Sequence, residues 1–188
     1  MNVMDLYGRA QDGFDTVLAG VGPDQWDAPS ECAEWSVRDV AGHLIWGQRQ
    51  LRAWATGDHY AEQGGPGSAH PAVVIDGDPL TTWRAAREAA TVELSEAVLA
   101  RPTTVPGIGE VPLMALVTLL VTDTVTHTWD IGHAIGADVR LEPEAVTVAF
   151  EWSRRNAMRR PGFFGPELPA PDDADEQARM LAFLGRKP

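Results

Sequence analysis

Long segments of this sequence place apolar residues in steps of three and four, and this spacing constrains the fold more than any other feature. A stripe of this kind gives a helix one face that must be buried. No short β-branched run precedes each helical segment, which disfavours a parallel α/β fold, and no run of strands is convincing. The spacing therefore predicts an all-α helical bundle, with helices over residues 4–21, 37–56, 79–99, 112–135, 143–160 and 174–184.

Local signals mark one helix start and the segments that leave the bundle. Ser36 stands three residues before Asp39, which is the spacing of a capping box at a helix N-terminus. Residues 59–78 contain the glycine-rich run 64–67 and no periodicity, so we predict a long exposed loop that could border a binding site. Residues 103–110 predict a short turn or small hairpin.

Length and charge exclude several classes of function. The chain has 188 residues and a formal net charge of -12, with Cys32 as its single cysteine. Such a negative charge repels nucleic acid and anionic membranes, so we expect neither as a partner. The longest apolar stretch, 111–121, is shorter than the roughly 20 residues that a membrane span needs. One cysteine permits no internal disulfide, and we expect a soluble, cytoplasmic protein.

The predicted helix 112–135 carries the most informative polar residues. Asp123 and His127 follow apolar residues such as Leu116 and Leu120, and at four residues apart they share one helical face. A carboxylate that faces the interior needs a partner, because burying an unpaired charge is costly. Two interpretations stay open: the two side chains hydrogen-bond each other or an arginine, or they bind a metal ion.

A metal site would need at least one further ligand from another helix, and His43 is the candidate. It flanks the inward-facing stripe of its predicted helix, where Gly42 and Gly47 leave room for a close helix approach. A lone histidine in such a place is more often a packed or surface residue than a ligand. Spacing alone therefore does not join His43 to Asp123 and His127.

Three segments, taken in order along the chain, carry a family resemblance. The first is residues 29–44, PSECAEWSVRDVAGHL, with Trp35 and His43; the second is residues 123–130, DTVTHTWD. Both resemble segments of the DinB-like superfamily, in the branch formed by the metal-binding N-terminal domain of mycothiol-dependent maleylpyruvate isomerase. The tail, residues 164–186, is similar to an uncharacterised actinobacterial subgroup. The resemblance covers nearly the whole chain.

The resemblance implies a DinB/YfiT-like four-helix bundle with extra short helices and a long loop. It implies a single metal-binding domain over residues 1–188, with 161–188 as a C-terminal extension packed on it. A divalent metal would be held by His43, Asp123 and His127. Zinc is the first choice and nickel the second, since imidazole and carboxylate ligands discriminate poorly between them. The implied cosubstrate is mycothiol or another low-molecular-weight thiol.

Two departures from the branch bear on function. The branch commonly has glutamate where this chain has Asp123, and a shorter side chain shifts or loosens the metal. We also expect no separate C-terminal domain of the kind that the branch has. The resemblance is therefore not extended to maleylpyruvate isomerisation itself.

Other polar and aromatic residues have weaker cases. Asp130 could either orient a metal ligand or form a salt bridge. His59, His70 and His133 are not expected at the ion. Cys32 could be a reactive thiol near the metal, but a single cysteine is more often a small buried apolar group, and we interpret it so. Four tryptophans could wall a pocket or simply belong to the core: Trp35, Trp46, Trp54 and Trp129.

Three hypotheses about function follow. The first is a metal-dependent thiol transferase or isomerase that acts on small electrophilic molecules, because three protein ligands leave coordination positions open. The second is a non-catalytic metal-containing bundle that binds a ligand or forms a homodimer. The third is a metal-free structural bundle in which Asp123 and His127 hydrogen-bond each other. No catalytic or cofactor-binding residue beyond the three ligands is assigned.

Overall fold

The computed structural model describes residues 2–32, 34–60, 63–105, 109–159 and 164–187. The predicted all-α class is confirmed, since the described elements are helices apart from one small hairpin. In chain order they are α1 (Val3–Ala19), η1 (Pro23–Gln25), α2 (Val37–Thr56), η2 (Pro71–Val74), α3 (Pro79–Thr91), α4 (Glu96–Leu99), β1 (Pro102–Val105), β2 (Gly109–Pro112), α5 (Leu113–Ala134), α6 (Pro143–Asn156) and α7 (Glu176–Phe183).

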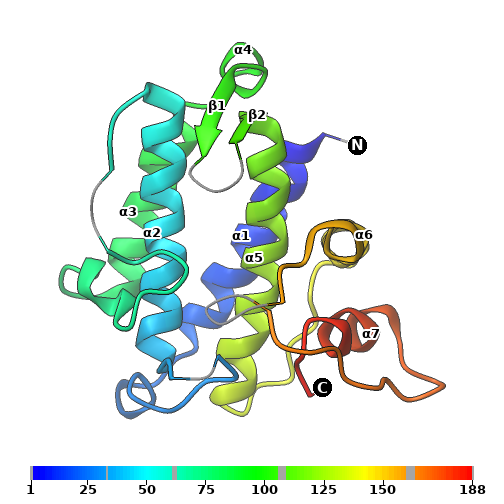
Figure 1. Cartoon of the computed structure of the whole chain (residues 1–188). Helices are drawn as coiled ribbons and strands as arrows, with labels where there is room; N and C mark the ends of the chain where they lie inside the picture. The colour runs from blue at the N-terminus through cyan, green and yellow to red at the C-terminus, as the bar shows by residue number, and fades with distance from the viewer. Residues whose placement is uncertain (1, 33, 61–62, 106–108, 160–163, 188) are drawn as a thin grey trace.

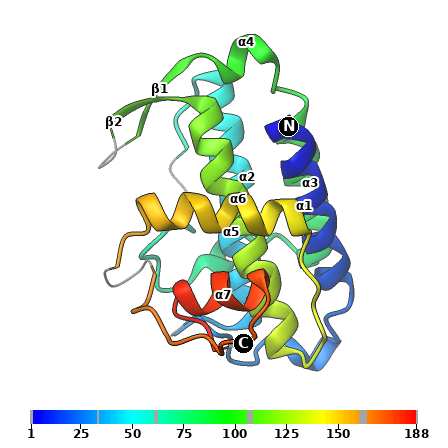
Figure 2. The ribbon, with the colours of Figure 1, turned by 90° about the vertical axis from the view of Figure 1, so that its right-hand side faces the viewer.

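Helices α1, α2, α3 and α5 form a four-helix bundle (Figure 1). Helix α1 packs against α3 and α5, and α2 packs against the same two helices from the other side. Helix α6 lies across the outer side of α5, and α7 lies against α6 (Figure 2). Because α5 is covered on several sides, its buried residues run around most of its circumference instead of along one stripe.

Two clusters of buried apolar side chains fill the interior. One joins residues from α1 through α7 and includes Leu6, Leu51, Leu113, Leu120 and Met180. The other lies among α1, α2, α3 and the end of α5 and includes Phe14, Val40, Ile45, Trp83 and Ile131. The inner faces of α2 and α5 contribute to both clusters, so a polar residue on these faces is enclosed by apolar packing.

The predicted capping box at the start of α2 is present. The Asp39 backbone N–H donates to Ser36 Oγ at 3.2 Å, and the Ser36 N–H donates to Asp39 Oδ2 at 3.1 Å. The second carboxylate oxygen of Asp39 accepts from the backbone N–H of Ala72 at 3.2 Å. This cap therefore also ties the segment around η2 to the N-terminus of α2.

The predicted helix over residues 79–99 was wrong in one respect, because it is broken. Helix α3 ends at Thr91, and the separate α4 starts after Ser95, whose Oγ accepts from the Val98 backbone N–H at 3.3 Å. Leu94 and Val98 still pack on the core cluster. The apolar spacing continues across the break because both pieces cover the same core, so the spacing alone does not reveal the turn.

The hairpin predicted as one option for residues 103–110 is confirmed. Strands β1 and β2 are antiparallel, with Thr103 opposite Val111 and Val105 opposite Gly109. Gly109 has φ +101°, a conformation that favours glycine. The predicted centre of the turn, residues 106–108, lies outside the described residues.

The C-terminal segment contributes buried side chains to the same interior as the bundle. Met180, Leu181 and Leu184 have no exposed surface and belong to the cluster that includes Leu6 of α1. The predicted end of the fifth helix, at residues 161–162, lies outside the described residues, and α6 ends earlier, at Asn156. The division into one domain with an extension over 161–188 stays a prediction.

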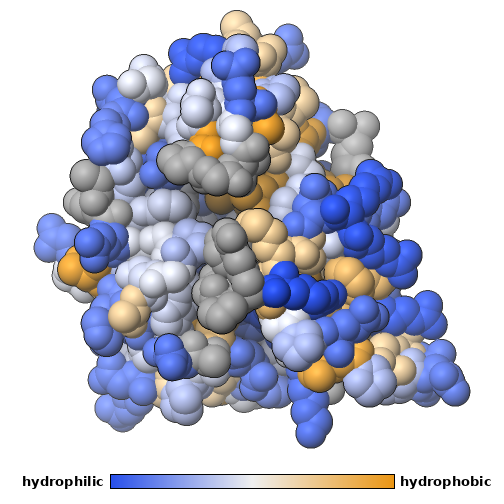
Figure 3. Space-filling model, viewed as in Figure 1, coloured by the Kyte–Doolittle hydropathy of each residue, from blue (hydrophilic) through white to orange (hydrophobic). Residues whose placement is uncertain are grey.

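None of the helices in the described part of the chain combines the length and the hydropathy that a membrane-spanning segment requires. On the face shown in Figure 3, hydrophilic residues dominate the periphery and apolar surface gathers towards the middle. Exposed large apolar side chains include Val73, Val92, Met114 and Met158.

We expect Leu181→Ala to lower the free energy of unfolding by about 2–5 kcal/mol, because it leaves a cavity in the cluster shared with α1. Denaturant titration followed by circular dichroism measures the change. Val92→Ala is the control, since Val92 is 74% exposed and its truncation should alter stability by less than about 0.5 kcal/mol. Equal stability of the two variants would show that α7 is not part of the cooperative core.

Candidate metal centre

The bundle brings together the three predicted ligands from two helices. His43 lies on the inner face of α2, and Asp123 and His127 lie one turn apart on the face of α5 that meets it. His43 Nε2 is 3.2 Å from Asp123 Oδ2, and His127 Nε2 is 3.3 Å from Asp123 Oδ1. Both imidazoles are buried, whereas the Asp123 side chain is 21% exposed. The carboxylate therefore stands between two imidazoles at the edge of the interior.

The Nδ1 atom of each imidazole, which points away from Asp123, contacts an oxygen atom that accepts a hydrogen bond. His43 Nδ1 is 2.9 Å from the carbonyl oxygen of Gly64, and His127 Nδ1 is 2.9 Å from Asp130 Oδ2. Each ring must therefore donate from Nδ1. In a neutral imidazole this leaves a lone pair on Nε2, and both lone pairs point at the Asp123 carboxylate.

Two lone pairs facing a carboxylate require positive charge between them. Burial lowers the pKa of His127, but the neighbouring acidic groups raise it by more, to well above its ordinary value. Burial likewise opposes ionisation of Asp123, yet His43 and His127 hold the pKa of that carboxyl far below its usual range. In a metal-free site this positive charge comes from protons on the imidazoles. In a metal-bound site it comes from the divalent cation.

The donor set fits a divalent cation. The three ligand atoms lie within 4.8 Å of one another, which one ion can bridge. Histidine ligands in metal sites commonly donate their second N–H to a carboxylate or a backbone carbonyl, as His127 and His43 do here. The convergence of the three side chains is thus a structural fact, and their role as ligands stays a prediction.

Asp130 is the partner that fixes His127, and it also forms a salt bridge. It has no exposed surface, and Arg186 donates to it twice, from Nε to Oδ1 at 3.0 Å and from Nη2 to Oδ2 at 2.8 Å. Burial alone would raise the pKa of Asp130, but Arg186 and His127 outweigh it and lower that pKa strongly. The salt bridge with Arg186 and the contact with His127 are thus both present, and orientation of a metal ligand by Asp130 stays a prediction.

The interpretation of Cys32 as a small buried apolar group omits the polar contacts that the structure gives it. Its Sγ lies 3.1 Å from Asp130 Oδ2 and 3.6 Å from His127 Nδ1. Burial and then the charge of Asp130 raise the pKa of the Cys32 thiol, so the protonated thiol donates to that carboxylate. Cys32, His127 and Asp130 form a second group of metal-ligating types, but Arg186 already provides the cation there.

The segment predicted as a long exposed loop borders the three predicted ligands, but it contains the short helix η2 and buried residues such as Gly64 and Pro71, because it packs on α2. Residues 61–62 lie outside the described residues. Trp35 Nε1 donates to the Ser68 carbonyl at 2.9 Å, and His43 binds the Gly64 carbonyl. A Cβ atom on Gly42 would lie 2.4 Å from the Pro71 carbonyl oxygen. The loop therefore rests directly on α2, and glycine at position 42 permits this close approach.

The four tryptophans divide between the two roles proposed for them. The Trp35 ring centre is 5.0 Å from that of His43 and 6.2 Å from that of His127, and Trp46 stacks on His43 at 6.0 Å. These two indoles wall the histidines. Trp129 is buried in the apolar cluster, and Trp54 packs against that cluster.

The remaining histidines lie outside the site, as predicted. His133 is about half exposed, pairs with Glu31 at 3.3 Å and stacks on Trp129. His59 and His70 are exposed. Neither belongs to a group of metal-ligating side chains within the described part of the chain.

Residues 7–132 match the family described as the mycothiol maleylpyruvate isomerase N-terminal domain. The chain belongs to this family. The family resemblance found in the sequence is thereby confirmed, and the matched region includes Cys32, His43, Asp123, His127 and Asp130. Arg186, α6 and α7 lie beyond the matched region of the mycothiol maleylpyruvate isomerase N-terminal domain.

Two relatives of this family member have been found in Mycobacterium tuberculosis. They are the uncharacterized protein MT0763 of strain CDC 1551 / Oshkosh and the uncharacterized protein Rv0738 of strain ATCC 25618 / H37Rv. Each is 31% identical over 192 residues, which span 99% of this chain and 98% of the relative. The similarity to these relatives thus includes the C-terminal segment. No solved structure matches the chain.

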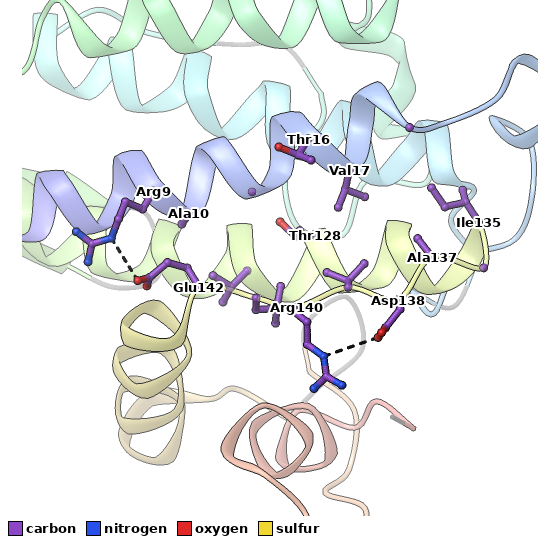
Figure 4. A pocket seen from close by; sticks show the side chains of 16 residues that line it. Arg9, Ala10, Thr16, Val17, Thr128, Ile135, Ala137, Asp138, Arg140 and Glu142 are labelled. Atoms are coloured by element: carbon purple, nitrogen blue, oxygen red, sulfur yellow. Dashed lines mark hydrogen bonds and ion pairs between the residues drawn. The ribbon is translucent and has the colours of Figure 1, made fainter.

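A groove on another side of the bundle does not share the site's chemistry. It lies between α1, α5 and residues 135–142 (Figure 4). Its charged side chains are paired with one another: Arg9 with Glu142, and Arg140 with Asp138.

We expect Gly42→Ala to lower the free energy of unfolding by about 1–3 kcal/mol, because the new methyl group collides with the backbone at Pro71. The displaced loop should also weaken any metal binding that depends on His43. Thermal unfolding and metal titration measure the two effects. Gly47→Ala in the same helix is the control: its Cβ would meet only Leu120 Cδ2, at 3.6 Å, and no loss is expected. A neutral Gly42→Ala would contradict the tight docking of the loop.

Proposed function

We propose that this protein is a divalent-metal-dependent enzyme that transfers a low-molecular-weight thiol to small electrophilic molecules or isomerises them. The observation that carries the proposal is the convergence of His43, Asp123 and His127 with both imidazoles fixed to donate outward. Membership in the mycothiol maleylpyruvate isomerase N-terminal domain family supports mycothiol as the thiol. The two mycobacterial relatives are uncharacterized, so they add no substrate.

Zinc is the favoured ion and nickel the next, with His43, Asp123 and His127 as ligands. Three protein ligands leave coordination positions open, as in catalytic sites. An ion held there supplies Lewis acidity and lowers the pKa of a thiol that binds to it. The chain's own residues provide the rest: Asp123 is the ligand nearest to solvent, and the Trp35 indole shields the two imidazoles from water.

A non-catalytic role is the second candidate, and one observation favours it. Within the described cluster the side chains beyond the three ligands are Cys32, Asp130 and Arg186, and all three bond to one another. No free acid or base stands among them to move a substrate proton. The protein would then hold a metal and either bind a ligand or form a homodimer. Light scattering would detect the homodimer.

We expect the purified protein to contain about one divalent ion per chain, measured by elemental analysis. His43→Ala and His127→Ala should each weaken zinc binding by more than about a hundredfold, since loss of a ligand exceeds the usual effect of losing a ligand's hydrogen-bond partner. His133→Ala is the matched control and should bind zinc normally, because His133 faces Glu31 at the surface. Folded protein that never binds a divalent ion would leave only the metal-free bundle.

We expect metal-loaded protein to consume mycothiol, or a substitute thiol, in the presence of a panel of small electrophiles. Chelation of the ion and His43→Ala should each abolish the reaction, because both remove the cation from the site. Loss of free thiol over time is the measurement. Metal-loaded protein that turns over none of the electrophiles with any thiol would favour the non-catalytic candidate.

A further inference from the structure

The C-terminal tail reaches back to the candidate metal centre through one side chain. Arg186 follows α7 and is 7% exposed, although it is an arginine close to the end of the chain. Its guanidinium holds both carboxylate oxygens of Asp130, and Asp130 Oδ2 accepts from His127 Nδ1. One chain of hydrogen bonds therefore runs from the tail to a predicted metal ligand.

Arg186 reaches Asp130 only when the tail is folded. The Arg186 backbone N–H donates to the Leu181 carbonyl at 2.9 Å, and the Nη1 group donates to the Leu184 carbonyl at 3.0 Å. Gly185, with φ +83°, makes the turn after α7, and a Cβ there would lie 2.9 Å from the Pro166 carbonyl oxygen. The position of the guanidinium thus depends on buried packing of Leu181 and Leu184 against the bundle.

The contacts of Arg186 fix how His127 is oriented. The guanidinium holds Asp130 at both carboxylate oxygens and so sets the direction of Oδ2. His127 Nδ1 lies 2.9 Å from Asp130 Oδ2, which turns the opposite nitrogen, Nε2, towards Asp123 Oδ1 at 3.3 Å. The same guanidinium keeps a second cation away from Cys32, His127 and Asp130 because it occupies both oxygens of Asp130.

We propose that Arg186 is a positioning residue of the metal centre, through which docking of the C-terminal tail strengthens binding of the ion by His43, Asp123 and His127. This inference rests on the proposed function only in requiring that the ion binds. The family match ends at residue 132, so Arg186 lies outside the matched region, whereas the similarity to the two mycobacterial relatives includes the C-terminal segment. By reciprocity, binding of the ion must stabilise the docked tail by the same factor.

The test is a zinc titration of the full chain and its variants against a chromophoric chelator. Arg186→Met should weaken zinc binding by about tenfold to a hundredfold, the usual effect of losing a partner that orients a metal ligand. Arg179→Met is the matched control on α7, because Arg179 is exposed and its guanidinium donates to the Asp172 carbonyl, away from Asp130. It should bind zinc normally.

A double-mutant cycle separates positioning from mere stability. Asp130→Asn should weaken zinc binding as Arg186→Met does, and the double variant should be no weaker than the more affected single variant, because both changes break one path. Arg186→Lys keeps the charge but loses the two-point contact, so an intermediate affinity is expected. If Arg186→Met does not fold, the zinc affinity of Arg186→Lys provides the test instead.

Hydrogen exchange over residues 176–186 supplies the reciprocal measurement, and zinc should slow exchange there in the unmodified chain. Wild-type zinc affinity in Arg186→Met, additive effects in the cycle, or unchanged exchange would overturn the positioning role while leaving the metal centre intact. Failure of the unmodified, folded chain to bind zinc or nickel would instead overturn the proposed function.

Discussion

The contact between Asp123 and the two imidazoles is the constraint on which the rest of this site depends. Helix α5 is buried on most sides, yet it carries Asp123, His127 and Asp130 at a spacing that places them along one face. Such a face is tolerated inside a helical bundle only if every charge and lone pair on it finds a partner. His43 from α2 and Arg186 from the tail supply partners on this face, and the proposed cation would complete the charge balance around Asp123.

The two histidines are fixed by different segments of the chain, and each segment is held by packing. The loop after α2 presents the Gly64 carbonyl to His43, and it rests on α2 because Gly42 has no side chain. Asp130 fixes His127, and the tail fixes Asp130 through Arg186. The orientation of both imidazoles therefore depends on segments that lie far from them in sequence. A change in the packing of the loop or of the tail would alter that orientation.

Family membership explains the bundle, and the chemistry of the site must be argued from its residues, because one fold supports many functions. The matched region contains all three predicted ligands, whereas the arginine that balances Asp130 lies beyond it. Asp123, a predicted ligand, has a shorter side chain than glutamate and so holds its carboxylate close to the α5 backbone. The surroundings of the three predicted ligands therefore depend on residues both inside and outside the matched region.

The sequence by itself determined the helices and the pair on α5, because apolar spacing and a four-residue interval are local properties of the chain. It did not reveal the break after Thr91, since α3 and α4 cover the same core. The family resemblance, not spacing, brought His43 to the site. Only the tertiary structure decided the roles of Gly64, Cys32 and Arg186, because their contacts join segments whose separation leaves no periodic signal, and they form only when the loop and the tail pack onto the bundle.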